Sequence, residues 1–296
     1  MRPGCRWFAC AFLLATGVAS PQTQEPSSTP VFRSSVEMVS MAAVVRNRQG
    51  RIVSSLSRDD FEVFDAGSRR PIVDLRADKS APASVALLVD SSGSMGVGRT
   101  LEAARLAAHE VLEALDASRD EAALLTFDSR LLELQPFTRD FEPIRTRLED
   151  LDAFGTTSLY DAIAQTARRI ASKARARRAI VVFTDGADTS SALKPAEVSG
   201  IASSIDVPVY VFALDGTRTD GPLADLARWT GGDYFIAGER TLAAAGIRQL
   251  VDELRHQYVL AFEPAGSSGW RRVEIRTRRP GLTVRARSWY LAGTSH

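Results

Sequence analysis

The sequence has the length and composition of an ordinary globular protein. Its 296 residues can form one large domain or two modest ones. Charged residues make up 25% and hydrophobic residues 45% of the chain, which excludes collagen-like, coiled-coil, wholly disordered and polytopic membrane proteins. A formal net charge of +1 gives no overall attraction to nucleic acid or anionic lipid, and three histidines are too few for a histidine-rich metal centre.

Residues 1–20 have the features of a secretory signal peptide. Arg2 and Arg6 precede an apolar run, residues 7–19, that ends in small residues. We expect cleavage after Ala19 or Ser20 and therefore an exported protein, either periplasmic or secreted. An uncleaved membrane anchor is the alternative, although the run is short for a bilayer. Both cysteines lie in this segment, so the cleaved chain would have neither a disulfide nor a membrane span.

Residues 21–32 are polar and rich in proline, and they are typical of a solvated linker. The next segment, residues 33–80, is predicted to be all β, because short apolar runs alternate with turn residues. Its strands are expected at residues 36–45, 51–53, 61–64 and 72–75.

Residues 82–256 alternate between strands and helices. The first strand, residues 84–90, is apolar throughout, as expected for a strand buried on both faces. Further strands are predicted at residues 122–127, 131–134, 179–185, 207–214 and 233–237. Helices are predicted at residues 101–115, 141–151, 159–174, 196–204, 223–229 and 241–255. This order predicts an α/β domain with a mostly parallel, doubly wound sheet and helices on both faces.

The last segment, residues 257–292, returns to β structure, with strands expected at residues 258–262, 272–277 and 282–286. Neither β segment is large enough for a core of its own. We therefore expect the N-terminal and C-terminal strands to pack together as one small β unit.

Oxygen-bearing side chains follow two of the buried strands. Asp90, Ser92 and Ser94 come after the first strand, a loop containing two threonines precedes a helix, and Asp185 closes the strand of residues 179–185. Ligands of parallel α/β sheets bind at the carboxyl ends of strands. Carboxylates and hydroxyls are hard donors suited to Mg²⁺, Mn²⁺ or Ca²⁺ and poor for zinc or copper.

This pattern resembles the von Willebrand factor type A (VWA) domain and its metal-ion-dependent adhesion site. The resemblance rests on the DxSxS sequence of residues 90–94, the threonine loop and the TDG sequence of residues 184–186, and it covers roughly residues 84–255. The flanking strands are similar to a bacterial family of VWFA-related proteins described from acidobacteria.

The resemblance implies a divalent cation, Mg²⁺ first and Mn²⁺ or Ca²⁺ as alternatives. Its implied ligands are Asp90, Ser92, Ser94, Thr157 and Asp185. The family's threonine stands five residues before a small residue that begins an apolar helix. Thr157 and Ala162 meet that condition, whereas Thr156 takes a place usually held by glycine.

The function that the resemblance implies is metal-dependent protein binding without catalysis, in which an Asp or Glu of the partner completes the ion's coordination. A metal-dependent hydrolase or phosphatase is one alternative, and a scaffold protein with a vestigial site is another. Hydrolysis would need a base and a substrate pocket, and the sequence offers no candidate for either; GxSxG, P-loop and HExxH motifs are also absent.

Several other polar residues are interpreted as structural and not as parts of a functional site. Seven arginines crowd residues 271–287 but alternate with apolar residues, which is typical of the solvated face of a strand and not of a nucleic-acid surface. The basic residues between 168 and 178 are interpreted as a helix surface and its exit. Ser158 and Asp161 are expected to cap a helix. Three further aspartates near strand ends are expected to form turns: Asp128, Asp188 and Asp215. For Asp188 and Asp215 the alternative is a position around the metal site without direct contact to the ion.

Overall fold

The computed structural model describes residues 38–171, 173, 177–214, 221–237, 240–266 and 268–293. The predicted signal peptide and linker lie outside the described residues, as does Asp215. Among the described residues, no helix combines the length and the apolar character needed to cross a membrane.

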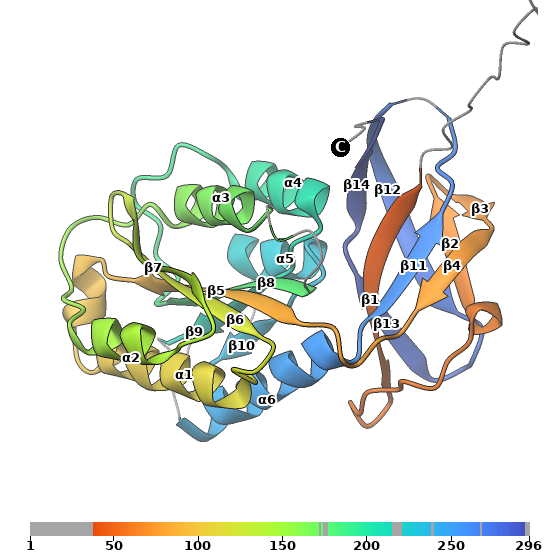
Figure 1. Cartoon of the computed structure of the whole chain (residues 1–296). Helices are drawn as coiled ribbons and strands as arrows, with labels where there is room; N and C mark the ends of the chain where they lie inside the picture. The colour runs from red at the N-terminus through yellow and green to blue at the C-terminus, as the bar shows by residue number, and fades with distance from the viewer. Residues whose placement is uncertain are drawn as a thin grey trace, which may run out of the picture. The chain divides into compact units, whose positions relative to one another are not determined.

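Six strands form a sheet in the middle of the chain, and six helices cover it (Figure 1). The strands are β5 (Ala83–Asp90), β6 (Glu121–Phe127), β7 (Leu131–Thr138), β8 (Arg177–Thr184), β9 (Val209–Ala213) and β10 (Tyr234–Ile236). The helices are α1 (Thr100–Ala114), α2 (Glu142–Glu149), α3 (Leu159–Ile170), α4 (Pro195–Ile205), α5 (Pro222–Trp229) and α6 (Arg240–Arg255). The strand order is β10-β9-β8-β5-β6-β7, and every neighbouring pair is parallel except β6 with β7. The predicted α/β fold class is confirmed.

The central strand β5 shows why the sheet needs helices on both faces. All eight of its residues are buried. Val85 and Leu87 belong to the core that includes residues of α1, α2 and α6, whereas Ala86 and Leu88 belong to the core that includes residues of α3, α4 and α5. Since full burial of a leucine contributes about 1.5–3 kcal/mol, a continuous apolar strand is stable only when both faces are covered.

The remaining strands form two four-stranded antiparallel sheets. One has the order β13-β1-β11-β4 and the other β14-β12-β2-β3. The strands before the α/β domain are β1 (Val39–Asn47), β2 (Phe61–Asp65), β3 (Ser68–Arg70) and β4 (Ile72–Arg76). The strands after it are β11 (Tyr258–Phe262), β12 (Gly269–Thr277), β13 (Leu282–Ala286) and β14 (Trp289–Ala292).

Both sheets combine N-terminal and C-terminal strands: β1 lies between β11 and β13 in one sheet, and β12 pairs with β2 in the other. The two sheets share one core, which includes Met41, Phe61, Tyr258 and Phe262. The predicted β unit made from both ends of the chain is therefore confirmed. Two of its strands, β3 and β14, were not predicted, and residues 51–53 contribute a single bridge, Arg46 to Ile52, instead of a strand.

Arginines connect the β unit to the α/β domain. Arg287, 7% exposed, donates to the carbonyl oxygens of Ser203 in α4 and Ser40 in β1. Arg285 forms ion pairs with Asp233 and with Glu253 of α6. The interpretation of these two arginines as a solvated face is wrong, because α4 and α6 cover that side of the strands.

The interpretation of Arg177 as part of a helix exit is also wrong. Arg177 lies in β8, not at the exit of a helix, and is 9% exposed. Its guanidinium donates to the carbonyl oxygens of Asp78 and Leu254, so the cost of burying the charge is offset by hydrogen bonds.

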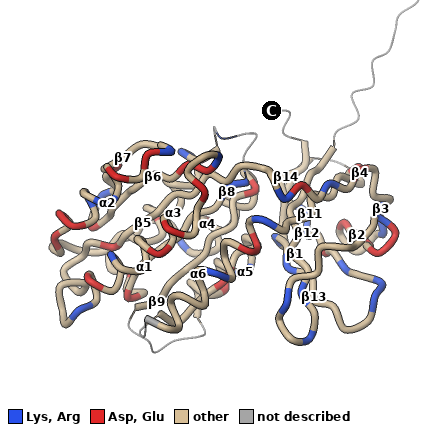
Figure 2. Tube along the Cα trace, turned by 60° about the horizontal axis from the view of Figure 1, so that its bottom comes forward, with Lys and Arg blue, Asp and Glu red and all other residues tan. Residues whose placement is uncertain are grey.

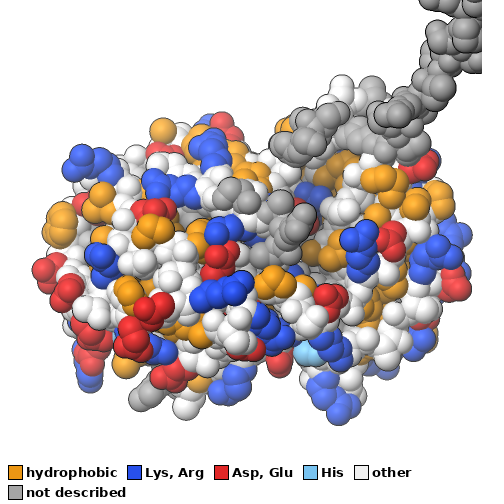
Figure 3. All heavy atoms as spheres, in the orientation of Figure 1, with side chains coloured by type: hydrophobic (Ala, Val, Ile, Leu, Met, Phe, Trp, Pro, Cys, Tyr) orange, Lys and Arg blue, Asp and Glu red, His pale blue; other side chains and the backbone are white. Residues whose placement is uncertain are grey.

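Other arginines of the last strands do face solvent and are neutralised there. Arg276 pairs with Glu274 at 2.6 Å, and Arg279 pairs with Asp60 at 2.7 Å. Basic and acidic residues are interspersed along the trace in Figure 2 and over the surface visible in Figure 3. This distribution agrees with the absence of a strong net charge.

Candidate functional site

Three loops meet at the carboxyl ends of β5 and β8. Backbone hydrogen bonds join the loop after β5 to the loop before α3, from the Phe154 amide to the Ser91 carbonyl at 2.8 Å and from the Gly93 amide to the Gly155 carbonyl at 3.1 Å. The loop after β8 joins the same cluster, because the Ser190 amide donates to the Thr157 carbonyl at 3.0 Å. The fold thus brings together the three loops that carry the predicted ligands.

Asp90 is the most deeply buried of the predicted ligands. It closes β5 with 0% exposure, and its carboxylate accepts hydrogen bonds from the Ser92 amide at 2.9 Å and the Thr184 hydroxyl at 2.6 Å. Burial raises the pKa of Asp90 to about 6 against the opposing effect of these hydrogen bonds, and the nearby charge of Asp185 raises the pKa further. The described residues include no Lys or Arg in an ion pair with either carboxylate. A bound cation would supply the missing positive charge.

The two serines lie on the short 3₁₀ turn that follows β5. Ser92 is buried and precedes η2 (Gly93–Gly96), whereas Ser94 is exposed, and their hydroxyl oxygens are 3.2 Å apart. The turn packs closely on the threonine loop, since a Cβ at Gly93 would stand 3.3 Å from the Gly155 carbonyl oxygen. Glycine at this position therefore permits the approach of the two loops.

The two threonines of the loop before α3 differ in environment. Thr157 is 3% exposed; its amide donates to the Thr189 hydroxyl at 3.0 Å, and its carbonyl accepts from the Thr189 amide at 2.9 Å. No described residue forms a hydrogen bond with the Thr157 hydroxyl. Thr156 is exposed and accepts a hydrogen bond from the Ser190 hydroxyl at 3.2 Å. Thr157 is thus the residue whose side-chain oxygen remains available.

Asp185 follows directly after β8 and is partly buried. Its Oδ1 accepts a hydrogen bond from the Ala187 amide at 3.1 Å, which leaves the other carboxylate oxygen for a ligand. The residue before it, Thr184, was missed by the sequence analysis. Its buried hydroxyl donates to Asp90 and accepts from the Gly186 amide at 3.0 Å, so it connects the two carboxylate-bearing loops. The TDG sequence marks this threonine, but nothing in the sequence indicates that its side chain points toward Asp90.

The neighbouring aspartates have structural roles. Asp188 accepts hydrogen bonds from the Leu159 amide at 2.9 Å, at the start of α3, and from the Ser191 hydroxyl. Ser158 occupies the N-cap position of α3, as predicted, but neither a side-chain capping bond nor a capping box with Asp161 is formed. Asp161 instead accepts from the amides of residues 192 and 193. Asp128 shapes the β6–β7 turn through the Arg130 amide at 2.8 Å, as predicted.

Large apolar side chains are exposed on the same loops. Phe154, in the threonine loop, is 62% exposed, and Val97, after η2, is 72% exposed. A cavity of about 270 Å³ lies beside Phe154, and its lining includes Ser91, Asp128 and Phe154 itself. This edge of the sheet therefore combines oxygen-bearing side chains with exposed apolar ones.

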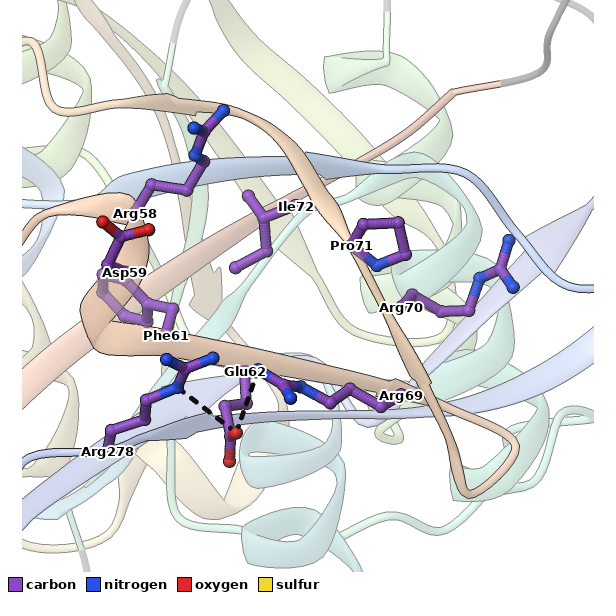
Figure 4. Close-up of a pocket in the computed structure, with 9 residues that line it drawn as sticks. All are labelled: Arg58, Asp59, Phe61, Glu62, Arg69, Arg70, Pro71, Ile72 and Arg278. Atoms are coloured by element: carbon purple, nitrogen blue, oxygen red, sulfur yellow. Dashed lines mark ion pairs between the residues drawn. The ribbon is translucent and has the colours of Figure 1, made fainter.

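A second cavity, of about 400 Å³, lies in the β unit and is lined by four arginines (Figure 4). Arg69 and Arg278 both point toward Glu62, each at 3.3 Å, and Arg70 donates to the Glu263 carbonyl at 2.9 Å. Arg58 is directed elsewhere, so the four guanidinium groups do not converge on a common point. The four arginines therefore do not form an anion-binding site.

Comparisons with known proteins agree with this description. Residues 85–187 match the family model described as the von Willebrand factor type A domain. A search of curated proteins gave no significant match. A solved structure of a von Willebrand factor type A protein from Catenulispora acidiphila is similar, with a TM-score of 0.51 and 14% identity over 88% of this chain and 76% of that one.

Two further solved structures are similar to this chain. Proximal thread matrix protein 1 from the mussel byssus has a TM-score of 0.50 and 13% identity, over 73% of this chain and 50% of that one. An aerotolerance-related membrane protein from Bacteroides fragilis has a TM-score of 0.49 and 21% identity, over 58% of this chain and 99% of that one. At such identities the likeness concerns the fold alone, and the family assignment comes from the matched sequence. The protein therefore contains a von Willebrand factor type A domain.

Proposed function

We propose that this protein is exported, to the periplasm or the medium, and that its VWA domain binds a protein partner through a divalent cation. Asp90, Ser92, Ser94, Thr157 and Asp185 would hold the ion, with Mg²⁺ preferred over Mn²⁺ or Ca²⁺. The observation that carries the proposal is the buried Asp90 carboxylate, which has no basic partner among the described residues and lies in a cluster of hydroxyl and carboxylate oxygens.

The donor set fits a hard cation with an open coordination position. Three neutral hydroxyls and two carboxylates would leave a bound divalent ion electrophilic, and that ion would offer a position to an Asp or Glu of the partner. The exposed side chains of Phe154 and Val97 add apolar area around this position.

The same surroundings favour binding over catalysis. The two described histidines are engaged elsewhere: His109 pairs with Glu149 at 2.8 Å, and His256 contacts the Asp252 carbonyl at 2.7 Å. Neither belongs to the three loops of the site, so neither is positioned to act as its general base.

Thermal unfolding of the full chain tests the metal site. Melting temperatures would be measured in EDTA and then with Mg²⁺, Mn²⁺ or Ca²⁺ in excess. An ion that binds only the folded state stabilises it by about 2.7 kcal/mol at a hundredfold excess over its dissociation constant, which is a rise of roughly 5–10 °C for a domain of this size. We expect this rise in the wild type and its loss in Asp90→Ala and Asp185→Ala.

Asp152→Ala is the matched control, because Asp152 is an exposed carboxylate in the wall of the neighbouring cavity and is not a proposed ligand. The melting temperature of Asp152→Ala should rise with added ion as much as that of the wild type. A wild type that no ion stabilises at millimolar concentration would refute the metal site. Turnover of a phosphoester such as p-nitrophenyl phosphate, abolished by Asp185→Ala, would favour the hydrolase alternative instead.

A further inference from the structure

A pocket of about 530 Å³ lies where the α/β domain meets the β unit. Its walls come from α4, the end of α5, and strands β12 and β14. All three tryptophans of the described residues line it: Trp229, Trp270 and Trp289. They are 37%, 48% and 42% exposed, which is unusual for the largest apolar side chains of a globular protein.

The positions of the three indoles are fixed by the fold. Trp270 pairs with Leu291 and Trp289 with Arg272, so the two tryptophans are diagonal neighbours on the outer face of adjacent strands. Helix α4 presents Gly200 to Trp270, and a Cβ at that glycine would stand 3.4 Å from the indole. The Ser288 amide donates to the Trp229 carbonyl at 3.0 Å and joins the end of α5 to the residue before β14.

Among the described residues that line the pocket, Glu197 is the only charged one. One of its carboxylate oxygens accepts a hydrogen bond from the Lys194 amide at 2.7 Å, at the start of α4. Among the described residues, no Lys or Arg side chain forms an ion pair with it. The pocket thus combines three indole side chains with one carboxylate that has no cationic partner among the described residues.

We propose that this tryptophan pocket binds an organic cation of the quaternary ammonium class. A cation over an indole face gains about 0.5–2 kcal/mol, most when it is desolvated, and aromatic cages with nearby carboxylates are suited to methylated ammonium groups. The pocket volume lies within the range of small-molecule sites, about 300–1,000 Å³.

Other small ligands fit the lining less well. A sugar needs many hydrogen-bonding groups, but beyond Glu197 and the indole N–H donors the described lining has only two serines with polar side chains. Ser199 is buried, and the Ser204 hydroxyl already donates to the Ile201 carbonyl at 2.8 Å. An anion would face Glu197 without any basic residue in the lining.

The test uses the tryptophans themselves as the probe. The chain has four tryptophans, so Trp7→Phe in the full-length protein leaves only the three of the pocket. Its fluorescence would be titrated with choline and with 3,3-dimethylbutan-1-ol, the neutral isostere in which carbon replaces nitrogen, both in EDTA. We expect a saturable change with choline and binding at least about tenfold weaker for the isostere.

Glu197→Gln removes the charge while keeping an oxygen to accept the Lys194 amide, so helix α4 should be retained. We expect it to weaken choline binding about tenfold without changing the affinity for the isostere. Glu113→Gln, at an exposed position of α1, is the matched control and should bind like the parent.

The proposal is overturned if choline and its isostere bind equally, if neither changes the fluorescence, or if Glu197→Gln leaves choline binding intact. Saturation by glucose in place of choline would likewise overturn it. Because every titration contains EDTA, failure here is distinct from failure of the metal site.

Discussion

Glu253 should be one of the most important single side chains for the stability of this protein. It lies in α6 with 0% exposure, although it carries a carboxylate. Arg46 of β1 donates to it at 2.6 Å and Gln249 at 3.1 Å, and Arg285 of β13 forms a further ion pair with it. This one carboxylate of the α/β domain therefore contacts two neighbouring strands of the β unit.

We expect Glu253→Ala to lower the free energy of unfolding by about 3 kcal/mol. Removing one partner of a buried ion pair costs about 3–5 kcal/mol, because the remaining charge stays buried without compensation. The lower end applies here, since both arginines keep about a fifth of their side-chain surface exposed and Arg285 retains its ion pair with Asp233. The corresponding loss in melting temperature is roughly 6–12 °C.

Urea denaturation followed by two probes measures this effect. Far-UV circular dichroism reports the α-helices, which in the described part of the chain all belong to the α/β domain, and tryptophan fluorescence reports the junction with the β unit. Both transitions should shift together if the two parts unfold as one cooperative unit. The matched control is Glu142→Ala, whose exposed pair with Arg145 at 3.4 Å should contribute less than about 1 kcal/mol. A Glu253→Ala loss no larger than that of the control would refute the reasoning.

Two further predictions concern stability. Burial alone would raise the pKa of Asp120, but hydrogen bonds from Arg255 and from the amides of residues 116 and 83 outweigh it, so the pKa lies below its usual value. The ionised Asp120 therefore stabilises the folded state fully above its pKa in the unfolded chain, about 3.9. This stabilisation is lost as the pH falls through the lower pKa of Asp120 in the folded protein. Urea midpoints should differ more between the wild type and Asp120→Asn at pH 7 than near pH 2, and an equal difference at both would contradict this. For Gly232→Ala, the added Cβ would stand 1.9 Å from the Val209 carbonyl oxygen. We expect Gly232→Ala to lower the free energy of unfolding by about 3 kcal/mol or more in the same assay. The control Gly200→Ala, whose Cβ would stand 3.4 Å from its nearest neighbour, should change it by no more than about 1 kcal/mol. Equal losses in the two variants would show that the backbone contact is not the cause.

The sequence by itself determined the α/β domain, because the signals there are local. A strand buried on both faces is continuously apolar, as residues 84–90 are, and an amphipathic helix repeats with the helical period, so each element is visible within its own residues. The carboxyl ends of parallel strands share one edge, and this rule correctly predicted that the loops of Asp90 and Asp185 would meet. Whether these loops bind metal stays a prediction.

The tertiary structure alone decided which polar residues face inward. Arg285 and Arg287 alternate with apolar neighbours as solvated residues do, and only the packing of α4 and α6 against the β unit turns that side into an interface. The inward position of Thr184 and the tryptophan pocket could not be predicted from local patterns either. Residues 229, 270 and 289, for example, meet only because elements far apart in the chain are in contact. Periodicity gives the direction of a side chain relative to its own strand or helix, but what lies in that direction depends on segments that a local pattern does not contain.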